Sequence, residues 1–521
     1  MITMGNNRKA VEKIDYMIIG IMLIAVATRL IGLGNLPDGM IPDEAYGAYN
    51  AYSIMNEGID SRGYRFPVYF VAWGSGMNAL YSYLAIPFMK IFGATIGVYR
   101  IPQAVVGIMS VYAMYQIGKD LFSRKIGYLL AFVLAINPWN IMNSRFGLES
   151  SLAPGMFLIA LCLLVKGLQQ NHKYLMIAAF AWGLLLYSYA LTWFVVPVFF
   201  LLLLAVYYKK IPHGATIAWF VGILFVMALP LILFMAINLN LMPEIRTSFM
   251  SIPKLPGFRG SELSITNVLY SIKDLVKMIA CQYDGSPHIS SETVGSYYLF
   301  TTPFILIGLV FHTVKFIKEY NKGDNGLEYV FLVWVVCALV QCILNQSINF
   351  TRTNLIHIPM IFYGTYGIWK IAELLKNSLL VPICVTFMCL SFGIFGYYYV
   401  TTEMTYFADE RMDEVIETAK DVAGDGTVTI IKCETIKYSL LLWHEKPAAS
   451  HYYQNVVYMG APGWAELERY GQFRYINELE EAVDKGVYII PTQPMGYELD
   501  LRQKGFEIQP VNDRFSLAIN K

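Results

Sequence analysis

Three carboxylates follow directly on the first apolar run of the chain. The stretch GNLPDGMIPDEAYGAYNAYS (34–53) contains Asp38, Asp43 and Glu44 within seven positions. A positioned carboxylate can take a proton from a reacting hydroxyl, and two adjacent carboxylates can hold Mg²⁺ or Mn²⁺. Asp43 also precedes a helix-like stretch, so a helix N-cap is the simpler alternative for it.

Other ionisable residues lie in or beside apolar segments, where a charge costs roughly 2.5–3.5 kcal/mol at a helix centre. They are Arg29, Arg100, Arg145, Glu149 and Arg352, with Asn354 and His357 close to the last. With the topology given below, all of them share the outer membrane level with the acid cluster. Carboxylates and arginines on one membrane face suit a substrate with an anionic head and an apolar tail.

Several of these residues also have a simpler structural explanation. Arg29 can extend its side chain to the outer interface. Arg145 and Glu149 are spaced i, i+4 and can form a local ion pair. His357 precedes a proline and is more typical of a packed histidine than of a ligand.

The composition is that of a membrane protein. The 521 residues are 56% hydrophobic and only 15% charged, whereas soluble domains carry about 25% charged residues. Repeated apolar stretches of about 20 residues predict a polytopic membrane protein. The net charge of +1 does not suggest a nucleic-acid partner.

Hydropathy predicts eleven spans. They lie near 15–34, 98–118, 126–142, 151–168, 174–190, 191–208, 214–237, 298–318, 328–346, 353–373 and 379–400. Basic residues mark cytoplasmic loops, and a basic N-terminus (Arg8, Lys9, Lys13) places that end inside. The loops alternate correctly only if residues 76–93 do not cross, so we expect them to form a helix at the outer surface.

Two domains are expected. Residues 1–400 form the transmembrane domain, with external loops 35–97 and 238–297, and the second loop contains an amphipathic helix near 261–280. Residues 401–521 form an extracytoplasmic α/β domain. Its helix is FADERMDEVIETAKDVA, and its strands are TVTIIK, GVYIIPT, GFEIQPV and RFSLAI.

Two stretches carry a resemblance to a known family. TRLIGLGNLPDGMIPDEAYGAYNAYSI resembles the first span and first loop of GT-C membrane glycosyltransferases, in particular the protein O-mannosyltransferases and lipid A aminoarabinose transferases. VYRIPQAVVGIMSVYAMYQIGKDLFSRKIGYLLAFVLAINPWNIMNSRFGLESS resembles their next block. The likeness extends over about residues 15–210. The loop 238–297 is too short for the sugar-binding domain that those mannosyltransferases carry there, which argues against a Ser/Thr protein acceptor.

The resemblance implies a sugar donor on a polyprenyl phosphate and inverting transfer to an acceptor hydroxyl reached from outside. Asp43 is then the expected base, and Glu44 positions the acceptor or Asp43. Arg145, Arg352 and Arg100 are the expected ligands of the donor phosphate. Supporting roles fall to Arg29, Asp38, Glu149, Asn354 and His357. No cofactor is required, and a divalent metal at Asp43 and Glu44 is the alternative.

Two other classes of protein stay open. A flippase or transporter of lipid-linked sugars would need polar groups at the midplane, usually in repeated halves, whereas these charges gather on one side and no halves repeat. A non-catalytic scaffold would have no use for buried arginines at the outer leaflet. The expected partners are the donor, membrane lipids and a glycan, lipid or protein acceptor, and the expected location is a bacterial plasma membrane.

Overall fold

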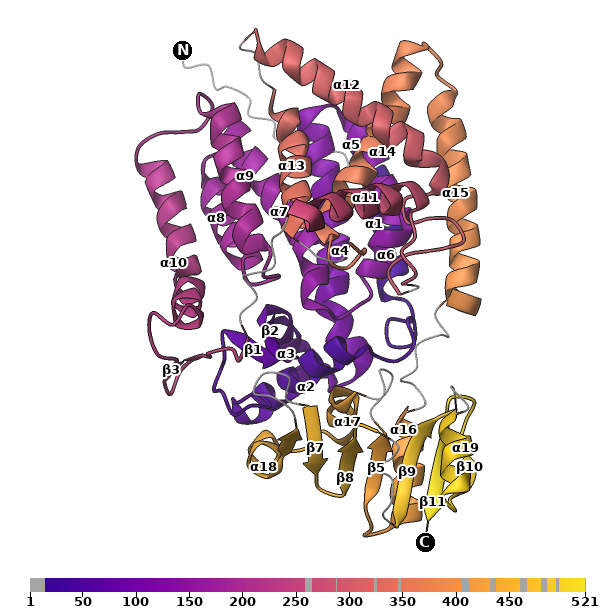
Figure 1. The fold of residues 1–521 in the computed structure, drawn as a ribbon. Coiled ribbons are helices and arrows are strands. Elements are labelled where there is room, and N and C mark those ends of the chain that lie inside the picture. The colour runs from indigo at the N-terminus through magenta and orange to yellow at the C-terminus, as the bar shows by residue number, and fades with distance from the viewer. Residues whose placement is uncertain are drawn as a thin grey trace, which may run out of the picture.

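The structure is a computed structural model that joins a helical bundle to a sheet-containing domain (Figure 1). It describes residues 15–257, 265–286, 288–322, 326–344, 348–403, 412–431, 437–459, 466–478, 485–492 and 496–520. The basic residues Arg8, Lys9 and Lys13 lie outside the described residues, as do 261–264 of the expected amphipathic helix and 407–411 of the expected C-terminal helix.

Each predicted span contains a helix. These helices are α1 (Tyr16–Leu30), α4 (Ile96–Leu121), α5 (Arg124–Ile136), α7 (Glu149–Gln169), α8 (Lys173–Leu185), α9 (Thr192–Tyr207), α10 (Ala215–Asn238), α12 (Thr302–Tyr320), α13 (Val330–Leu344), α14 (His357–Leu374) and α15 (Leu380–Tyr398). In the described part of the chain, five helices are long and apolar enough to cross a membrane. The chain is therefore a multi-pass membrane protein, and the count of eleven crossings and their orientation stay predictions.

The bundle has a packed centre and an apolar periphery. In α7, 72% of the residues in its apolar 18-residue stretch are buried, whereas in α15 only 17% of the residues in the corresponding stretch are buried. Helices α4 and α5 approach closely because each has a glycine at the contact: a Cβ on Gly118 would come within 2.7 Å of the Cα of Gly127. Small residues at such crossings allow membrane helices to pack by van der Waals contact.

The first loop folds as α2 (Pro42–Glu57), a hairpin of β1 (Tyr69–Ala72) and β2 (Ser75–Asn78), and α3 (Leu80–Phe92). Helix α3 has 13 residues and contains a proline. At 1.5 Å per residue it is about 20 Å long, shorter than a hydrocarbon core of about 30 Å. Helices α5 and α8 have the same length, so the surface position of α3 stays a prediction from the basic loops.

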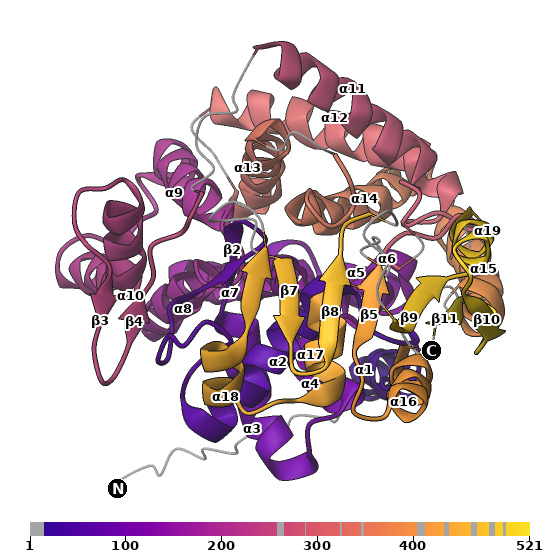
Figure 2. The ribbon, with the colours of Figure 1, turned by 60° about the horizontal axis from the view of Figure 1, so that its bottom comes forward.

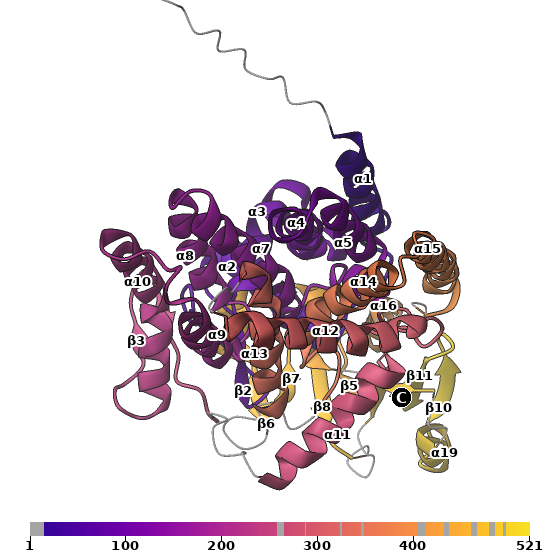
Figure 3. The same ribbon diagram turned by 90° about the horizontal axis from the view of Figure 1, so that it is seen from above.

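The second loop contains β3 (Ile245–Arg246), β4 (Ser251–Ile252) and the helix α11 (Ile265–Cys281). Helix α11 runs across the direction of the long helices (Figures 1 and 3). It buries Ser271, Leu275 and Met278 along one stripe and exposes apolar residues such as Val276 on its other side.

The C-terminal domain is built on a seven-stranded mixed sheet in the order β10-β11-β9-β5-β8-β7-β6 (Figure 2). Its strands are β5 (Val428–Ile431), β6 (Val457–Met459), β7 (Glu466–Tyr470), β8 (Phe473–Ile476), β9 (Gly486–Pro491), β10 (Glu507–Pro510) and β11 (Phe515–Asn520). Its helices are α16 (Met412–Ala423), α17 (Tyr438–Glu445), α18 (Ala449–Asn455) and α19 (Gly496–Gln503). Strand β5 pairs in parallel with β8 and β9, and the other pairings are antiparallel.

Candidate active site

Asp43 stands in the first turn of α2. The N-cap of this helix is Ile41, and no side chain caps it, so Asp43 is not the N-cap residue. Pro42 begins the helix, where its missing N–H and fixed φ cost nothing. The positive end of the helix dipole favours carboxylates in this turn.

Asp43 is exposed to solvent and yet surrounded by protein groups. Desolvation raises the pKa of Asp43, while the indole N–H of Trp73 and the charges of Arg352 and Lys437 oppose the rise. A carboxylate whose pKa is shifted by desolvation and by specific charged partners is a candidate for a functional group. The carboxylates of Glu149 and Asp43 lie near enough to repel each other.

Glu44, the next residue, is held in the interior. Arg100 donates to both of its oxygens, with 2.7 Å from Nε to Oε1 and 2.8 Å from Nη2 to Oε2, and both side chains are fully buried. The backbone N–H of Gly147 also donates to Oε1 at 2.7 Å. Arg100 gives its remaining hydrogen bonds to the carbonyls of residues 33, 37 and 39. Its guanidinium therefore has five protein contacts and faces no open space.

Arg145 and Arg29 are bound in the same way. Arg145 donates to the carbonyls of Thr28, Ile31 and Leu36, at the end of α1 and just beyond it, over 2.8–2.9 Å. Arg29 is fully buried and donates to the carbonyls of residues 134 and 135 and to Asn140 Oδ1. Cations near the carboxyl end of a helix interact favourably with the negative end of the helix dipole. These arginines fix the end of α1 and the loop leading to α2.

The group around Arg352 divides into one exposed residue and two buried ones. Arg352 is exposed and acts on the charge of Asp43. Asn354 is buried; its amide donates to the Ser150 carbonyl and accepts from Gln341. His357 is fully buried between the hydroxyl of Tyr297 and the carbonyl of Phe350, as expected for a packed histidine.

Glu149 begins α7 and accepts a hydrogen bond from the backbone N–H of Asn78 at the end of β2. Among the described residues no salt bridge joins Glu149 to Arg145. The local i, i+4 pair therefore does not form. Asp38 lies half-buried in the loop before α2.

Sequence reasoning missed Trp73 and Lys437. Trp73 occupies the turn between β1 and β2 with a φ of 49°, and WGSG at this turn is a hairpin signal. Lys437 comes from the C-terminal domain, directly before α17. No local sequence signal relates it to a residue almost four hundred positions earlier.

The C-terminal domain is docked on α2 (Figure 2). The ring of Tyr438, the first residue of α17, lies 5.3 Å from that of Trp73 and 6.3 Å from that of Tyr46 on α2. Glu57, at the end of α2, accepts from the backbone N–H groups of Ala449 and Ser450 at 2.6 and 2.9 Å. The start of α17 is thus held near the first turn of α2.

One group in the described residues has the spacing of a metal site. Glu417, His444 and Glu445 bring ligand atoms within 4.8 Å of one another on the C-terminal domain. Lys420 already donates to both glutamates, at 3.4 and 3.0 Å, and so supplies a positive charge there. At Asp43, both oxygens of the neighbouring Glu44 are bound by Arg100, which leaves that carboxylate unsuited to share an ion.

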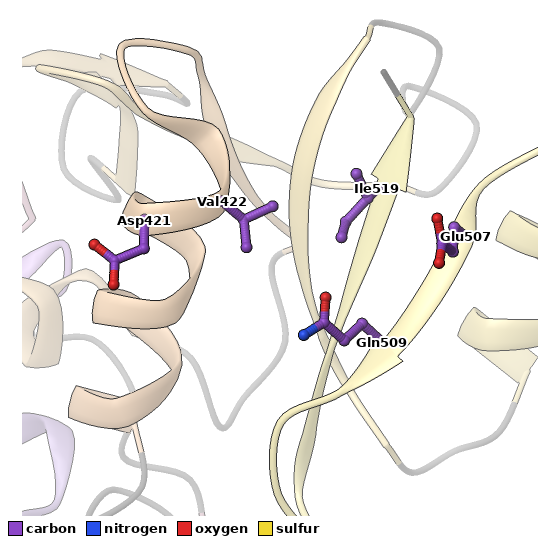
Figure 4. Close-up of a pocket in the computed structure, with 5 residues that line it drawn as sticks. All are labelled: Asp421, Val422, Glu507, Gln509 and Ile519. Carbon is purple, nitrogen blue, oxygen red and sulfur yellow. The ribbon is translucent and has the colours of Figure 1, made fainter.

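A hollow of about 430 Å³ lies elsewhere, between α16 and the β10–β11 edge of the sheet (Figure 4). Its lining is Asp421, Val422, Glu507, Gln509 and Ile519. This lining contains two carboxylates and no cation, so it does not suit a phosphate. Asp43, in contrast, has the positive charges of Arg352 and Lys437 nearby, and we place the candidate site there.

Residues 79–236 match the family profile described as dolichyl-phosphate-mannose-protein mannosyltransferase. This part of the chain is similar to that glycosyltransferase family. The match begins after Asp43 and ends before Arg352 and the C-terminal domain, so it does not include these parts of the site. A search of curated protein sequences finds no match.

Solved structures extend the likeness over most of the chain. ArnT from Cupriavidus metallidurans in the apo state has a TM-score of 0.60 at 11% identity, with 97% of this chain and 98% of ArnT covered. ArnT bound to undecaprenyl phosphate gives 0.60 at 10% identity with the same coverage. The oligosaccharyltransferase AglB from Archaeoglobus fulgidus, in complex with an inhibitory peptide and a dolichol-phosphate, gives 0.51 at 14% identity over 83% of this chain and 63% of AglB. The GT-C fold expected from the first-loop motifs is confirmed.

Proposed function

We propose that this protein transfers a sugar from a polyprenyl-phosphate-linked donor to an acceptor hydroxyl at the extracytoplasmic membrane face, with inversion at the anomeric carbon. One observation carries the proposal: Asp43 is exposed to solvent although protein groups desolvate it, and the positive charge of Arg352 acts on it. In such a pair, the carboxylate can accept the proton of a hydroxyl nucleophile, and the cation can bind an anionic leaving group. The family match and the ArnT-like fold support this chemistry.

In the proposed reaction, Asp43 accepts the proton of the acceptor hydroxyl as its oxygen bonds to the anomeric carbon. The bond from that carbon to the phosphate oxygen breaks, and its electron pair stays on the phosphate. Positioned general bases contribute about 10²–10⁴-fold to the rate. Burial, which raises the pKa of Asp43, makes its carboxylate a stronger base.

Arg352 is the proposed ligand of the donor phosphate. Its exposed guanidinium can bind two phosphate oxygens and stabilise the charge that develops on them. We assign Arg100, Arg145 and Arg29 to the frame instead, because their N–H groups bind protein carbonyls and Glu44. Glu44 then positions α2, and with it Asp43. In this scheme the positive charge comes from side chains, so a metal is not required.

The proposed orientation has the N-terminus in the cytoplasm and the C-terminal domain outside. Residues 35–97, 238–297 and 401–521 then lie on the acceptor side. The short second loop favours a glycan or lipid acceptor over a Ser/Thr protein.

The test is sugar transfer by purified protein in detergent. Synthetic polyprenyl-phosphate donors with labelled hexoses and pentoses are offered with an extract of cell-envelope glycans and lipids. The proposal expects labelled product from one donor and none with Asp43→Asn. Movement of the intact donor across vesicles, equal in wild type and variant and without product, would instead indicate a flippase.

A further inference from the structure

We infer that the C-terminal domain supplies a residue of the active site: Lys437 binds the donor phosphate opposite Arg352 and stabilises the polyprenyl phosphate leaving group. This inference rests on the proposed function and adds to it a second phosphate ligand from the other domain. It makes the C-terminal domain part of the catalytic unit.

The first step is position. Lys437 immediately precedes α17, whose first residue, Tyr438, packs its ring against Trp73 and Tyr46. Tyr46 lies three residues after Asp43, close to one turn further along α2. The aromatic contacts therefore hold the start of α17 over the first turn of α2. Lys437 is half-buried and its charge reaches Asp43.

The second step is that this placement is fixed at more than one point. Tyr49 donates to the Pro447 carbonyl at 3.1 Å, beyond the other end of α17. Glu57 binds the first N–H groups of α18, and the Arg62 guanidinium lies 3.9 Å over the Tyr458 ring. Contacts from α2 and from the turn that follows it thus orient the domain. A lysine held in this way loses less conformational freedom on binding a ligand.

The third step is charge. The phosphodiester of the donor has one negative charge, and the phosphomonoester that leaves approaches two. The positive charges that act on Asp43 are those of Arg352 and Lys437. Two cations match the nearly doubly charged leaving phosphate better than the singly charged donor. They therefore bind the transition state, in which this charge develops, more strongly than the bound donor, and such a difference in binding accelerates the reaction.

The experiment compares Lys437→Gln, Lys437→Arg and Lys446→Gln in purified protein. Lys446 ends the same helix, over the Trp443 ring, and serves as the matched control. Binding of polyprenyl monophosphate is measured without any transfer. Loss of a charged hydrogen bond corresponds to about 10- to 100-fold weaker binding in Lys437→Gln. We expect Lys437→Arg to retain most of the affinity and Lys446→Gln to match wild type.

A second measurement uses the kinetics of transfer. In Lys437→Gln, the inhibition constant for polyprenyl monophosphate should rise more than the KM for the donor, because the product has the greater charge. A purely structural role would change both equally and would not be rescued by arginine. The inference is overturned if Lys437→Gln binds the monophosphate like wild type, or if folded Lys437→Arg fails to restore binding. If no donor is used by wild type but the binding pattern holds, the proposed function fails and this site stands.

Discussion

Arg100 and Glu44 form a paired contact of two hydrogen bonds, 2.7 and 2.8 Å long, with no solvent exposure on either side chain. The contact joins the start of α4 to the start of α2, and three carbonyls of the loop between α1 and α2 bind the same guanidinium. The first turn of α2 is therefore fixed by a residue 56 positions later in the chain.

Glu44→Gln should destabilise the fold. Removal of one partner of a buried ion pair leaves the other charge uncompensated and costs about 3–5 kcal/mol. Unfolding in detergent measures the cost. The control is Arg100→Met, alone and combined with Glu44→Gln: the double variant should lose less than the sum of the singles. Additive losses would show that the two residues do not act as a pair.

Asp43→Asn should abolish sugar transfer and leave the fold intact, since an amide keeps the shape but cannot accept the proton. The expected loss in kcat is about 10²–10⁴-fold. Initial rates and thermal unfolding of the purified variant measure both parts. The control is Asp421→Asn, an exposed aspartate on α16 in the C-terminal domain. Near-normal turnover in Asp43→Asn would remove Asp43 as the base, and loss through unfolding alone would give it a structural role.

The wild-type enzyme should lose activity as pH falls, because protonated Asp43 cannot act as a base. Its pKa is raised by burial, so the acid limb should lie above the ordinary value for an aspartate, about 3.9. Rates measured at saturating donor across pH locate the limb. A limb at or below that value would contradict an enclosed base.

Sequence patterns predicted most of the framework because hydropathy and length are local properties. All eleven expected spans contain helices, and β5, β9, β10 and β11 coincide with runs of β-branched and aromatic residues. Strands β6, β7 and β8 were missed: they are short, and β7 and β8 contain charged residues such as Arg469 and Arg474 at their contact. Pairing within the sheet overrides such weak local preferences.

The roles of the arginines could not be predicted in the same way. An arginine in an apolar segment marks a buried charge, but the sequence does not say whether its partner is a ligand or the protein itself. For Arg29, Arg100 and Arg145 the partners are mainly backbone carbonyls at the ends of α1 and α5 and in the loop before α2, which have no sequence signature. Lys437 is the opposite case, since its position depends on how two distant segments pack.

Arg352→Ala should act on donor binding more than on turnover. The lipid phosphate would lose a paired cation, which corresponds to about 10- to 100-fold in the KM for the donor. Initial rates against donor concentration give KM and kcat. The control is Arg246→Ala, an exposed arginine paired with Glu244 in the second loop. A fall in kcat at unchanged KM would instead place Arg352 at the acceptor or at the base.

Residues 76–93 should have both flanks on the same side of the membrane, because the basic loops alternate correctly only if this segment does not cross. Phe66→Cys and Lys90→Cys introduce thiols at exposed positions before and near the end of this segment. In a cysteine-free background, a membrane-impermeant maleimide added to intact cells should label both. If one of the two thiols were labelled only after the membrane is opened, residues 76–93 would have to cross the membrane. Every later loop would then lie on the opposite side, and the eleven-span topology would be wrong.

Glu57 should hold the C-terminal domain on α2 in a pH-dependent way. Desolvation raises its pKa, but hydrogen bonds from Ser450 and Ala449 outweigh this and leave the pKa lowered. A lowered pKa means that docking is stabilised above the ordinary value for a glutamate, about 4.3, and that this stabilisation is lost as pH falls through the lowered value. Glu57→Ala should remove it at every pH.

Amide hydrogen exchange in α18 measures this docking. A carboxylate at a helix N-terminus contributes about 0.3–1 kcal/mol, so exchange of residues 449–455 at neutral pH should quicken about two- to fivefold in Glu57→Ala. The matched control is Asn56→Ala, whose side chain donates a hydrogen bond to the Tyr52 carbonyl of its own helix. Faster exchange in both variants would mean that α2 itself has loosened. Unchanged exchange in Glu57→Ala would show that the aromatic contacts at Tyr438 dock the domain without the carboxylate.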